Sequence, residues 1–302
     1  MMARMPDLSR RAVLRLGAGA ATGALGAYAL DKLLPTRPPL TAPVTMTGTG
    51  VPLAPRPLDP APAPVAAPTM MTGSFVSAAR GGIATNWAIA RPPGQTKPLR
   101  PVIALHGKGS SAATVMDGGV EQGLAQAVNA GLPPFAVVSV DGGGSYWHKR
   151  ASGEDSGAMV LNELIPMLDT KGLDTSRVAF LGWSMGGYSA LLLGGRLGAP
   201  RTAAICAVSP ALWLSSGAAA PGAFDGPDDF SANSVFGMPA LASIPIRVDC
   251  GNSDPFYGAI KQFVAQLPNP PAGGFSPGGH DASFWSSQLP AELTWMAPLL
   301  TA

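Results

Sequence analysis

Residues 177–193 read RVAFLGWSMGGYSALLL, and this stretch decides the fold. The apolar run 178–181 is typical of a buried strand, and the alanine and leucines of 190–193 favour a helix. Between them GWSMG, residues 182–186, matches the pattern Gly-x-Ser-x-Gly. A strand, a sharp turn and a helix in this order expose a serine hydroxyl at the tip of the turn, because the small glycines let the turn close. We therefore predict that Ser184 is a nucleophile.

The sequence holds a second match to the same pattern, GFSPG at residues 274–278. The residue after such a nucleophile must donate its backbone N–H to the developing oxyanion, and Pro277 has no N–H. No apolar run typical of a strand precedes this match. Ser276 is therefore not expected to be a nucleophile.

A serine hydroxyl is a weak nucleophile at neutral pH and needs a base within hydrogen-bond reach, which an acid in turn orients. The chain has three histidines. Around a serine turn of this kind the chain order is serine, then aspartate or glutamate, then histidine, so His106 and His148 come too early. This leaves His280, in the glycine-rich loop GGHD of residues 278–281. We predict that His280 is the base.

The acid must lie between Ser184 and His280, an interval without glutamate. Its aspartates are Asp225, Asp228, Asp229, Asp249 and Asp254. In open α/β sheets the functional groups lie in loops at the carboxyl ends of the strands. Asp254 lies just beyond the predicted strand 246–250 and is favoured. Asp249, still inside that strand, is the alternative, ahead of the three acids further upstream.

The oxyanion of an attacked carbonyl needs two backbone N–H groups aimed at the developing charge. One is expected from Met185, directly after the nucleophile. The other is expected from Lys108, in the loop after the apolar strand of residues 101–105. The neighbouring His106 is expected to brace this loop rather than to take part in chemistry.

The loop DGGGSYWH, residues 141–148, follows the predicted strand beside the serine turn. We predict that its Trp147 and His148, together with Trp183, line the pocket for the acyl or alcohol group of a substrate. For the two residues of the loop, packing in the core is the alternative interpretation.

Apolar strands alternate with helical segments from residue 101 onward, which indicates an α/β fold: a mostly parallel sheet with helices on both faces. Gly81-Gly82 marks a hairpin before this pattern. Residues 211–243, here called the excursion, break the rhythm with many alanines, glycines and serines. We interpret the excursion as a cover over the carboxyl edge of the sheet, or else as a long surface loop.

The first 73 residues differ in composition from the rest. Residues 1–34 carry Arg10-Arg11 before a weakly hydrophobic run and resemble a twin-arginine signal, with a Sec-type signal or an uncleaved anchor as the alternative. Residues 35–73 hold 11 prolines between Pro35 and Pro68 and are expected to form an extended linker. The folded domain is predicted for residues 74–302, on the outer side of the cytoplasmic membrane: the periplasm, the cell envelope or the medium.

Charge and motifs exclude several classes of partner. Residues 1–73 hold 7 of the 20 basic but 3 of the 18 acidic residues, so the domain itself carries slightly more acidic than basic groups. No basic stripe with interleaved aromatic residues is present, and we predict no nucleic-acid partner. No metal-ligand spacing or cofactor motif is present either, so no metal and no cofactor are expected.

The chain has two cysteines, Cys206 and Cys250. We expect two buried thiols, or a disulfide if their strands are neighbours.

Several short motifs together resemble the esterase D family of α/β-hydrolases, which includes S-formylglutathione hydrolase and the mycolyltransferase antigens of mycobacteria. The matching pieces are LHGKG (105–109), SYWH (145–148), GED (153–155), GWSMGG (182–187), GNSDPF (251–256) and GHD (279–281). The resemblance implies a triad of Ser184, Asp254 and His280, in agreement with the chain-order argument. The mycolyltransferases have a glutamate as triad acid, which this interval lacks.

The expected function is therefore that of an exported serine esterase acting on a small-molecule or lipid ester, and delivered by the twin-arginine export machinery. An acyltransferase of the mycolyltransferase type is one alternative, and a non-catalytic envelope-binding module is the other. The small residues of the excursion indicate a mobile cover and not a dry site for an acceptor alcohol, which favours hydrolysis.

Overall fold

The structure of the protein, a computed structural model, describes residues 69–95 and 97–301. Contacts divide the chain into residues 1–59 and residues 60–302, and all described residues belong to the second unit. The predicted export segment 1–34 and most of the predicted linker lie outside the described residues. The first strand begins at Thr69, so residues 69–73, which we predicted as linker, belong to the folded domain.

Eight strands form one sheet, in the order β1-β2-β4-β3-β5-β6-β7-β8. Strands β1 and β2 run antiparallel to their neighbours, and the strands from β3 to β8 run parallel to one another. Their bounds are β1 Thr69–Ser77, β2 Ile83–Arg91, β3 Pro101–Leu105, β4 Ala136–Val140, β5 Val178–Trp183, β6 Thr202–Val208, β7 Ile246–Gly251 and β8 Ala272–Ser276. Every residue of β3, β4 and β6 is buried, as expected for central parallel strands covered on both faces.

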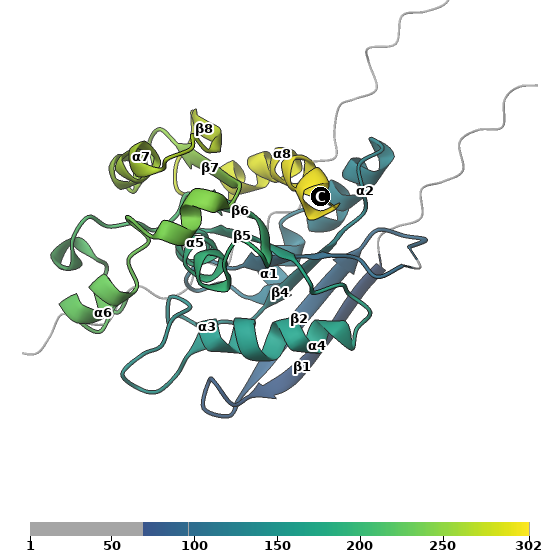
Figure 1. Cartoon of the computed structure of the whole chain (residues 1–302), viewed down its shortest axis with the longest axis horizontal. Coiled ribbons are helices and arrows are strands. Elements are labelled where there is room, and N and C mark those ends of the chain that lie inside the picture. The colour runs from purple at the N-terminus through teal and green to yellow at the C-terminus, as the bar shows by residue number, and fades with distance from the viewer. Residues whose placement is uncertain (1–68, 96, 302) are drawn as a thin grey trace, which may run out of the picture. The chain divides into compact units, whose positions relative to one another are not determined.

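Helices cover both faces of this sheet, which confirms the predicted fold class. Their bounds are α1 Ala112–Asp117, α2 Val120–Asn129, α3 Ser156–Ala158, the π-helix η1 Met159–Leu164, α4 Ile165–Asp169, α5 Met185–Leu197, α6 Pro227–Ala232, α7 Tyr257–Gln266 and α8 Ala282–Thr301, with short 3₁₀ turns η2 Ser216–Ala218 and η3 Pro239–Ser243. One core packs η1, α4, α5 and α7 against the sheet, and a second core packs α1, α2 and α8 against the other face. Figure 1 shows α8 beside α2, across the sheet from α3 and α4.

Outside the excursion, α1 and β8 were not predicted from the sequence. Helix α1 is one and a half turns long and begins after Ser111, whose hydroxyl accepts a hydrogen bond from the Thr114 N–H at 3.3 Å. Strand β8 reads AGGFS and pairs only with β7. An edge strand need not be apolar on both faces, and β8 has two glycines in five residues. It therefore lacks the apolar run that would have predicted a strand. The expectation that no strand precedes Ser276 is therefore wrong, since Ser276 is the last residue of β8.

The two cysteines are free and buried. Their strands β6 and β7 are neighbours, as a disulfide would require. Cys206 lies in the core on the α8 face of the sheet, whereas Cys250 lies in the core on the opposite face. Because the sheet separates the two thiols, the structure supports two buried thiols and not a disulfide.

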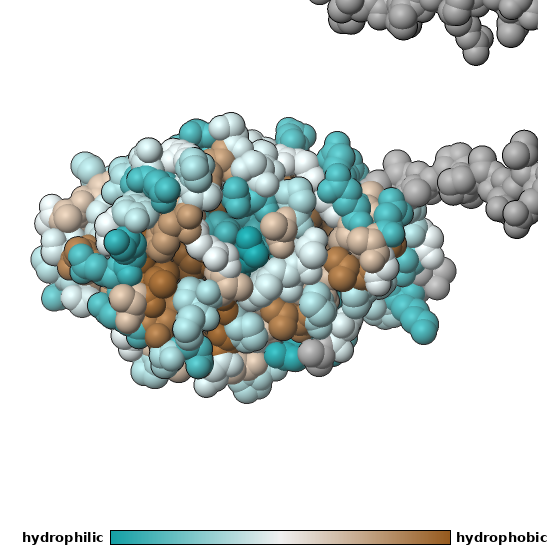
Figure 2. Space-filling model, turned by 90° about the horizontal axis from the view of Figure 1, so that it is seen from above, coloured by the Kyte–Doolittle hydropathy of each residue, from teal (hydrophilic) through white to brown (hydrophobic). Residues whose placement is uncertain are grey.

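Large apolar side chains reach the surface from separate segments: Met71, Val76, Ile83, Leu214 and Phe275. On the face drawn in Figure 2, hydrophobic residues show in several areas among hydrophilic ones. Within the described residues, none of the helices combines the length and the apolarity needed to span a membrane.

Candidate active site

Ser184 lies at the sharp turn between β5 and α5, with φ 55° and ψ −120°. This is a strained conformation for a residue with a side chain, and such strain gathers at functional sites. The turn closes only because two flanking positions are glycine. A Cβ atom on Gly182 would lie 2.3 Å from the carbonyl oxygen of Gly186, and one on Gly186 would lie 1.9 Å from that of Leu105. The predicted serine turn is therefore present.

The structure brings Ser184, His280 and Asp254 into one hydrogen-bonded chain. Nε2 of His280 lies 2.9 Å from Oγ of Ser184, and Nδ1 of His280 lies 2.8 Å from Oδ2 of Asp254. A carboxylate only accepts, so Nδ1–H donates to it and Nε2 is left free to accept the serine proton. This is the relation of nucleophile, base and orienting acid that a triad requires.

Asp254 follows β7 in a tight turn and its side chain is fully buried. Its second oxygen accepts a hydrogen bond from the Phe256 N–H at 2.8 Å. Burial raises the pKa of this carboxyl, but the hydrogen bonds from His280 and from Phe256 outweigh that effect and hold the pKa below its usual range. Asp254 therefore stays ionised beside the imidazole.

Asp249, the alternative acid, faces elsewhere. Both of its carboxylate oxygens accept hydrogen bonds from Arg247, at 2.6 Å and 3.1 Å. It pairs in register with Val208, on the face of the sheet that α8 covers. The geometry thus selects Asp254 over Asp249 as the acid beside His280, a choice that the sequence alone left open.

His280 is held in place by the residues that follow it and by two aromatic rings. Asp281 accepts a hydrogen bond from the Phe284 N–H at 3.0 Å and so caps the first turn of α8. The rings of Phe256 and Trp285 contact the imidazole edge-on, with centroids at 5.1 Å and 5.2 Å. The imidazole, and the end of the loop that leads into α8, are thereby held in place.

The two predicted oxyanion donors border the serine turn. Met185 is the first residue of α5, where backbone N–H groups have no partner inside the helix. Lys108 follows Gly107, whose Cβ, if present, would lie 3.2 Å from Trp183 and 3.5 Å from Cβ of Ser184. The loop after β3 is therefore in contact with the turn that carries the nucleophile.

His106 braces this loop, as expected. Its Nδ1 donates to the carbonyl of Gly107 at 2.7 Å, and its Nε2 accepts from the N–H of Gly142 at 2.9 Å. Burial lowers the pKa of His106, and the hydrogen bond to Gly107 offsets only part of this effect. A neutral imidazole therefore joins the loops that follow β3 and β4.

Trp147 and His148 do not lie where we predicted them. Both side chains are fully buried and outside the pocket beside Ser184. Tyr146 and Trp147 have φ near 57°, and this turn directs the indole inward, where its Nε1 donates to the His106 carbonyl at 3.4 Å. His148 stacks on Phe224 of the excursion, with ring centroids 5.3 Å apart. The alternative interpretation, packing in the core, applies to both residues.

Trp183 does line the pocket beside Ser184, a cavity of about 260 Å³. The pocket lies between the carboxyl ends of the central strands, α1 and α8. Its lining is Gly107, Lys108, Ser110, Thr114, Val115, Gly118, Trp183, Ser184, Val208, His280, Ala282, Trp285, Ser286, Leu289 and Glu292. Sequence reasoning missed the contribution of α8. Its lining residues lie three or four positions apart after His280, a helical period that the sequence does contain.

The excursion is tied to the domain more firmly than its composition indicates. Arg150 and the Ala151 N–H bind the carboxylate of Asp225, and these hydrogen bonds lower its pKa to about 2. The hydroxyl of Tyr188 donates to the Asn233 carbonyl at 2.8 Å. Near the site, Nζ of Lys108 donates to the carbonyl of Pro221 at 3.4 Å. The excursion therefore borders the site as an ordered segment.

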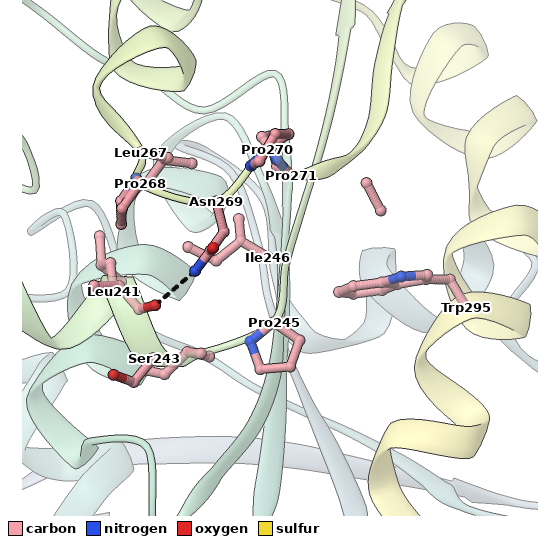
Figure 3. A pocket seen from close by; sticks show the side chains of 13 residues that line it. Leu241, Ser243, Pro245, Ile246, Leu267, Pro268, Asn269, Pro270, Pro271 and Trp295 are labelled. Carbon is pink, nitrogen blue, oxygen red and sulfur yellow. Dashed lines mark hydrogen bonds between the residues drawn. The ribbon is translucent and has the colours of Figure 1, made fainter.

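A larger groove, of about 430 Å³, lies elsewhere on the domain. It is formed at the amino ends of β7 and β8, whereas the triad lies at the carboxyl ends of the strands. Figure 3 shows its proline-rich wall, the hydrogen bond from Asn269 to the carbonyl of Ala242 and, across the groove, Trp295 of α8. None of its lining residues is titratable, so this groove offers no group for acid–base chemistry.

Comparison with known proteins gives a match in structure but not in sequence. No family model and no curated protein matches the chain. An S-formylglutathione hydrolase from Agrobacterium tumefaciens is 17% identical, with a TM-score of 0.66 over 78% of this chain and 96% of that one. A ferulic acid esterase is 20% identical, with a TM-score of 0.63 over 77% of this chain and 99% of that one.

An S-formylglutathione hydrolase from Staphylococcus aureus is also similar, with 17% identity and a TM-score of 0.64 over 77% of this chain and all of that one. The fold is thus the α/β-hydrolase fold, and these similar structures are esterases of the kind that the sequence motifs resemble.

Proposed function

We propose that this α/β-hydrolase is a serine esterase that cleaves carboxylic esters through an acyl-enzyme on Ser184. The observation that carries the proposal is the chain of hydrogen bonds from Ser184 through His280 to the buried Asp254. Esterases and serine hydrolases among the similar structures support ester hydrolysis as the reaction class.

The first half of the reaction forms the acyl-enzyme. Oγ of Ser184 attacks the ester carbonyl carbon while Nε2 of His280 takes the serine proton, and Asp254 stabilises the resulting imidazolium. The carbonyl oxygen becomes an oxyanion and accepts hydrogen bonds from the N–H groups of Met185 and Lys108. When the tetrahedral intermediate collapses, the C–O bond to the alcohol breaks and Nε2–H donates the proton to the leaving alkoxide oxygen.

The second half repeats these steps with water. His280 takes a proton from water as the water oxygen attacks the acyl carbon, and the second intermediate expels Oγ of Ser184, which regains its proton from Nε2. The products are a carboxylic acid and an alcohol. The apolar walls supplied by Val115, Trp183 and Leu289 suit a hydrophobic part of the ester. The cavity, about 260 Å³, is slightly smaller than the usual ligand pocket of roughly 300–1,000 Å³.

Labelling and product analysis together test this function. A fluorophosphonate probe is expected to label Ser184 alone, as located by peptide mapping, and a short-chain p-nitrophenyl ester is expected to yield mostly free acid. The same assay with an excess of a sugar acceptor measures acyl transfer. Mostly acylated sugar, even at low acceptor concentration, would contradict hydrolysis. The absence of both labelling and turnover would support a non-catalytic binding module.

We further propose that the protein leaves the cytoplasm through the twin-arginine machinery, on the basis of Arg10-Arg11 and the weakly hydrophobic run after them. Changing both arginines to lysine is expected to leave folded, active protein in the cytoplasm, as measured by fractionation and esterase assay. Unchanged export of this variant would indicate the Sec route or another signal.

A further inference from the structure

A buried carboxyl group of the pocket has no role in the reaction described above. Glu292 of α8 is 1% exposed and lines the same pocket as Ser184. Its Oε1 is buried without a hydrogen-bond partner. A buried polar atom in this condition is costly, and native proteins keep few of them without a reason. Glu292 therefore calls for an explanation that the triad does not provide.

The wall that α8 supplies to the pocket passes from exposed to buried residues. The helix contributes Ala282, Trp285, Ser286, Leu289 and Glu292 to the lining, over about 15 Å of helix. Ala282 and Ser286 are exposed, whereas Leu289 and Glu292 are buried. Glu292 thus lies in a buried part of the pocket that also holds the nucleophile.

The surroundings of Glu292 favour its neutral form. A carboxylate oxygen of Glu292 lies within 4.8 Å of the Cys206 thiol and of the Asp249 carboxylate. Burial raises the pKa of Glu292 well above its usual range, Asp249 raises it further, and Arg247 offsets only part of this effect. A neutral carboxyl has an O–H to donate as well as an oxygen to accept.

The same three side chains do not make a convincing metal site. Among the described residues, Cys206, Asp249 and Glu292 form one cluster whose spacing could suit a metal ion. Asp249, however, already neutralises Arg247 through two hydrogen bonds. A second cation beside this guanidinium would be repelled. A hydrogen-bonding role in the pocket suits Glu292 better.

We propose that Glu292 is a specificity-determining residue that hydrogen-bonds a carbonyl or hydroxyl group at the far end of the substrate's acyl chain. This inference rests on the proposed esterase function. The acyl group stays bound to Ser184 while the alcohol leaves and water enters, so the closed end of the pocket suits the acyl group. Apolar walls then bind its middle, and Glu292 selects a polar end over a plain alkyl end.

The test compares two acyl groups of similar size. The substrates are p-nitrophenyl esters of (ω−1)-oxo acids and of the matching branched acids, in which a methyl-bearing CH replaces the ketone, over a series of chain lengths. At one length the wild-type protein is expected to show a kcat/KM roughly 10-fold or more higher for the oxo acid. The preference is expected to survive in Glu292→Gln, which keeps a donor, and to vanish in Glu292→Met.

Controls separate specificity from stability. Leu289→Met changes the same wall of the pocket without introducing a polar group. It is expected to change kcat/KM for both substrates to a similar extent. Melting temperatures of all variants show whether Glu292→Met folds; it is expected to be no less stable than the wild type, because it removes an unpaired buried polar group. A loss of activity that is equal for both substrates would mean a merely structural role and would overturn the inference.

Two further outcomes would overturn the inference about Glu292 and leave the proposed esterase function intact. The wild type could hydrolyse both esters with no preference at any length, or the preference could arise only for a ketone placed on the alcohol side. In either case Ser184 would still be needed for turnover. A different result would contradict the proposed function itself: esterase activity that persists in Ser184→Ala.

Discussion

Replacing Ser184 with alanine is expected to lower kcat for ester hydrolysis by roughly 10³–10⁶-fold, the range for loss of a triad nucleophile. Alanine keeps Cβ, so the strained backbone at φ 55° is equally strained in the variant and only the hydroxyl is lost. The remaining oxyanion donors can still bind the ester, so KM should change much less than kcat. Initial rates with a p-nitrophenyl ester, together with a melting curve, measure both effects.

Ser276→Ala is the matched control, because it lies in the second Gly-x-Ser-x-Gly match. Ser276 ends the edge strand β8 and is followed by Pro277, which cannot donate a backbone N–H. Its replacement should leave kcat nearly unchanged. Activity lost in Ser276→Ala and kept in Ser184→Ala would move the nucleophile to the second match.

Replacing Asp254 with asparagine is expected to cost on the order of 10⁴ in kcat. The variant keeps the size of the side chain, but an amide can donate to Nδ1 of His280, which stabilises the tautomer whose Nε2 carries the proton. That imidazole cannot accept the proton of Ser184. The pH profile of kcat/KM should change along with the rate, since the stabilising charge beside the imidazolium is gone.

Asp249→Asn is the corresponding control, with the same chemical change inside β7, the strand that precedes Asp254. It weakens the pair with Arg247 on the α8 face and leaves the hydrogen bonds of His280 in place. Its cost in kcat should be far smaller than that of Asp254→Asn. If Asp249→Asn were the more damaging of the two, the acid would have to be reassigned to Asp249.

Much of the site could be predicted from short segments and from chain order. A buried strand, a glycine turn and a helix are local patterns, so Ser184 was predicted from residues 177–193 alone. The base and the acid needed one more argument, the order of loops at the carboxyl edge of the sheet. With three histidines to choose from, that order was enough to select His280. Among the five aspartates of the interval, Asp254 was favoured because it lies just beyond a strand, where functional groups gather in such sheets.

The sequence by itself thus determined the sheet apart from its edge strand β8, the serine turn and the order of the catalytic side chains, because hydrophobic periodicity and glycine are local signals. Only the tertiary structure decided which way other side chains face. Trp147 turns into the core because two successive residues take positive φ, and Glu292 reaches the pocket because α8 packs across the carboxyl end of β6. Such placements depend on contacts between segments far apart in the chain, and no local pattern records them.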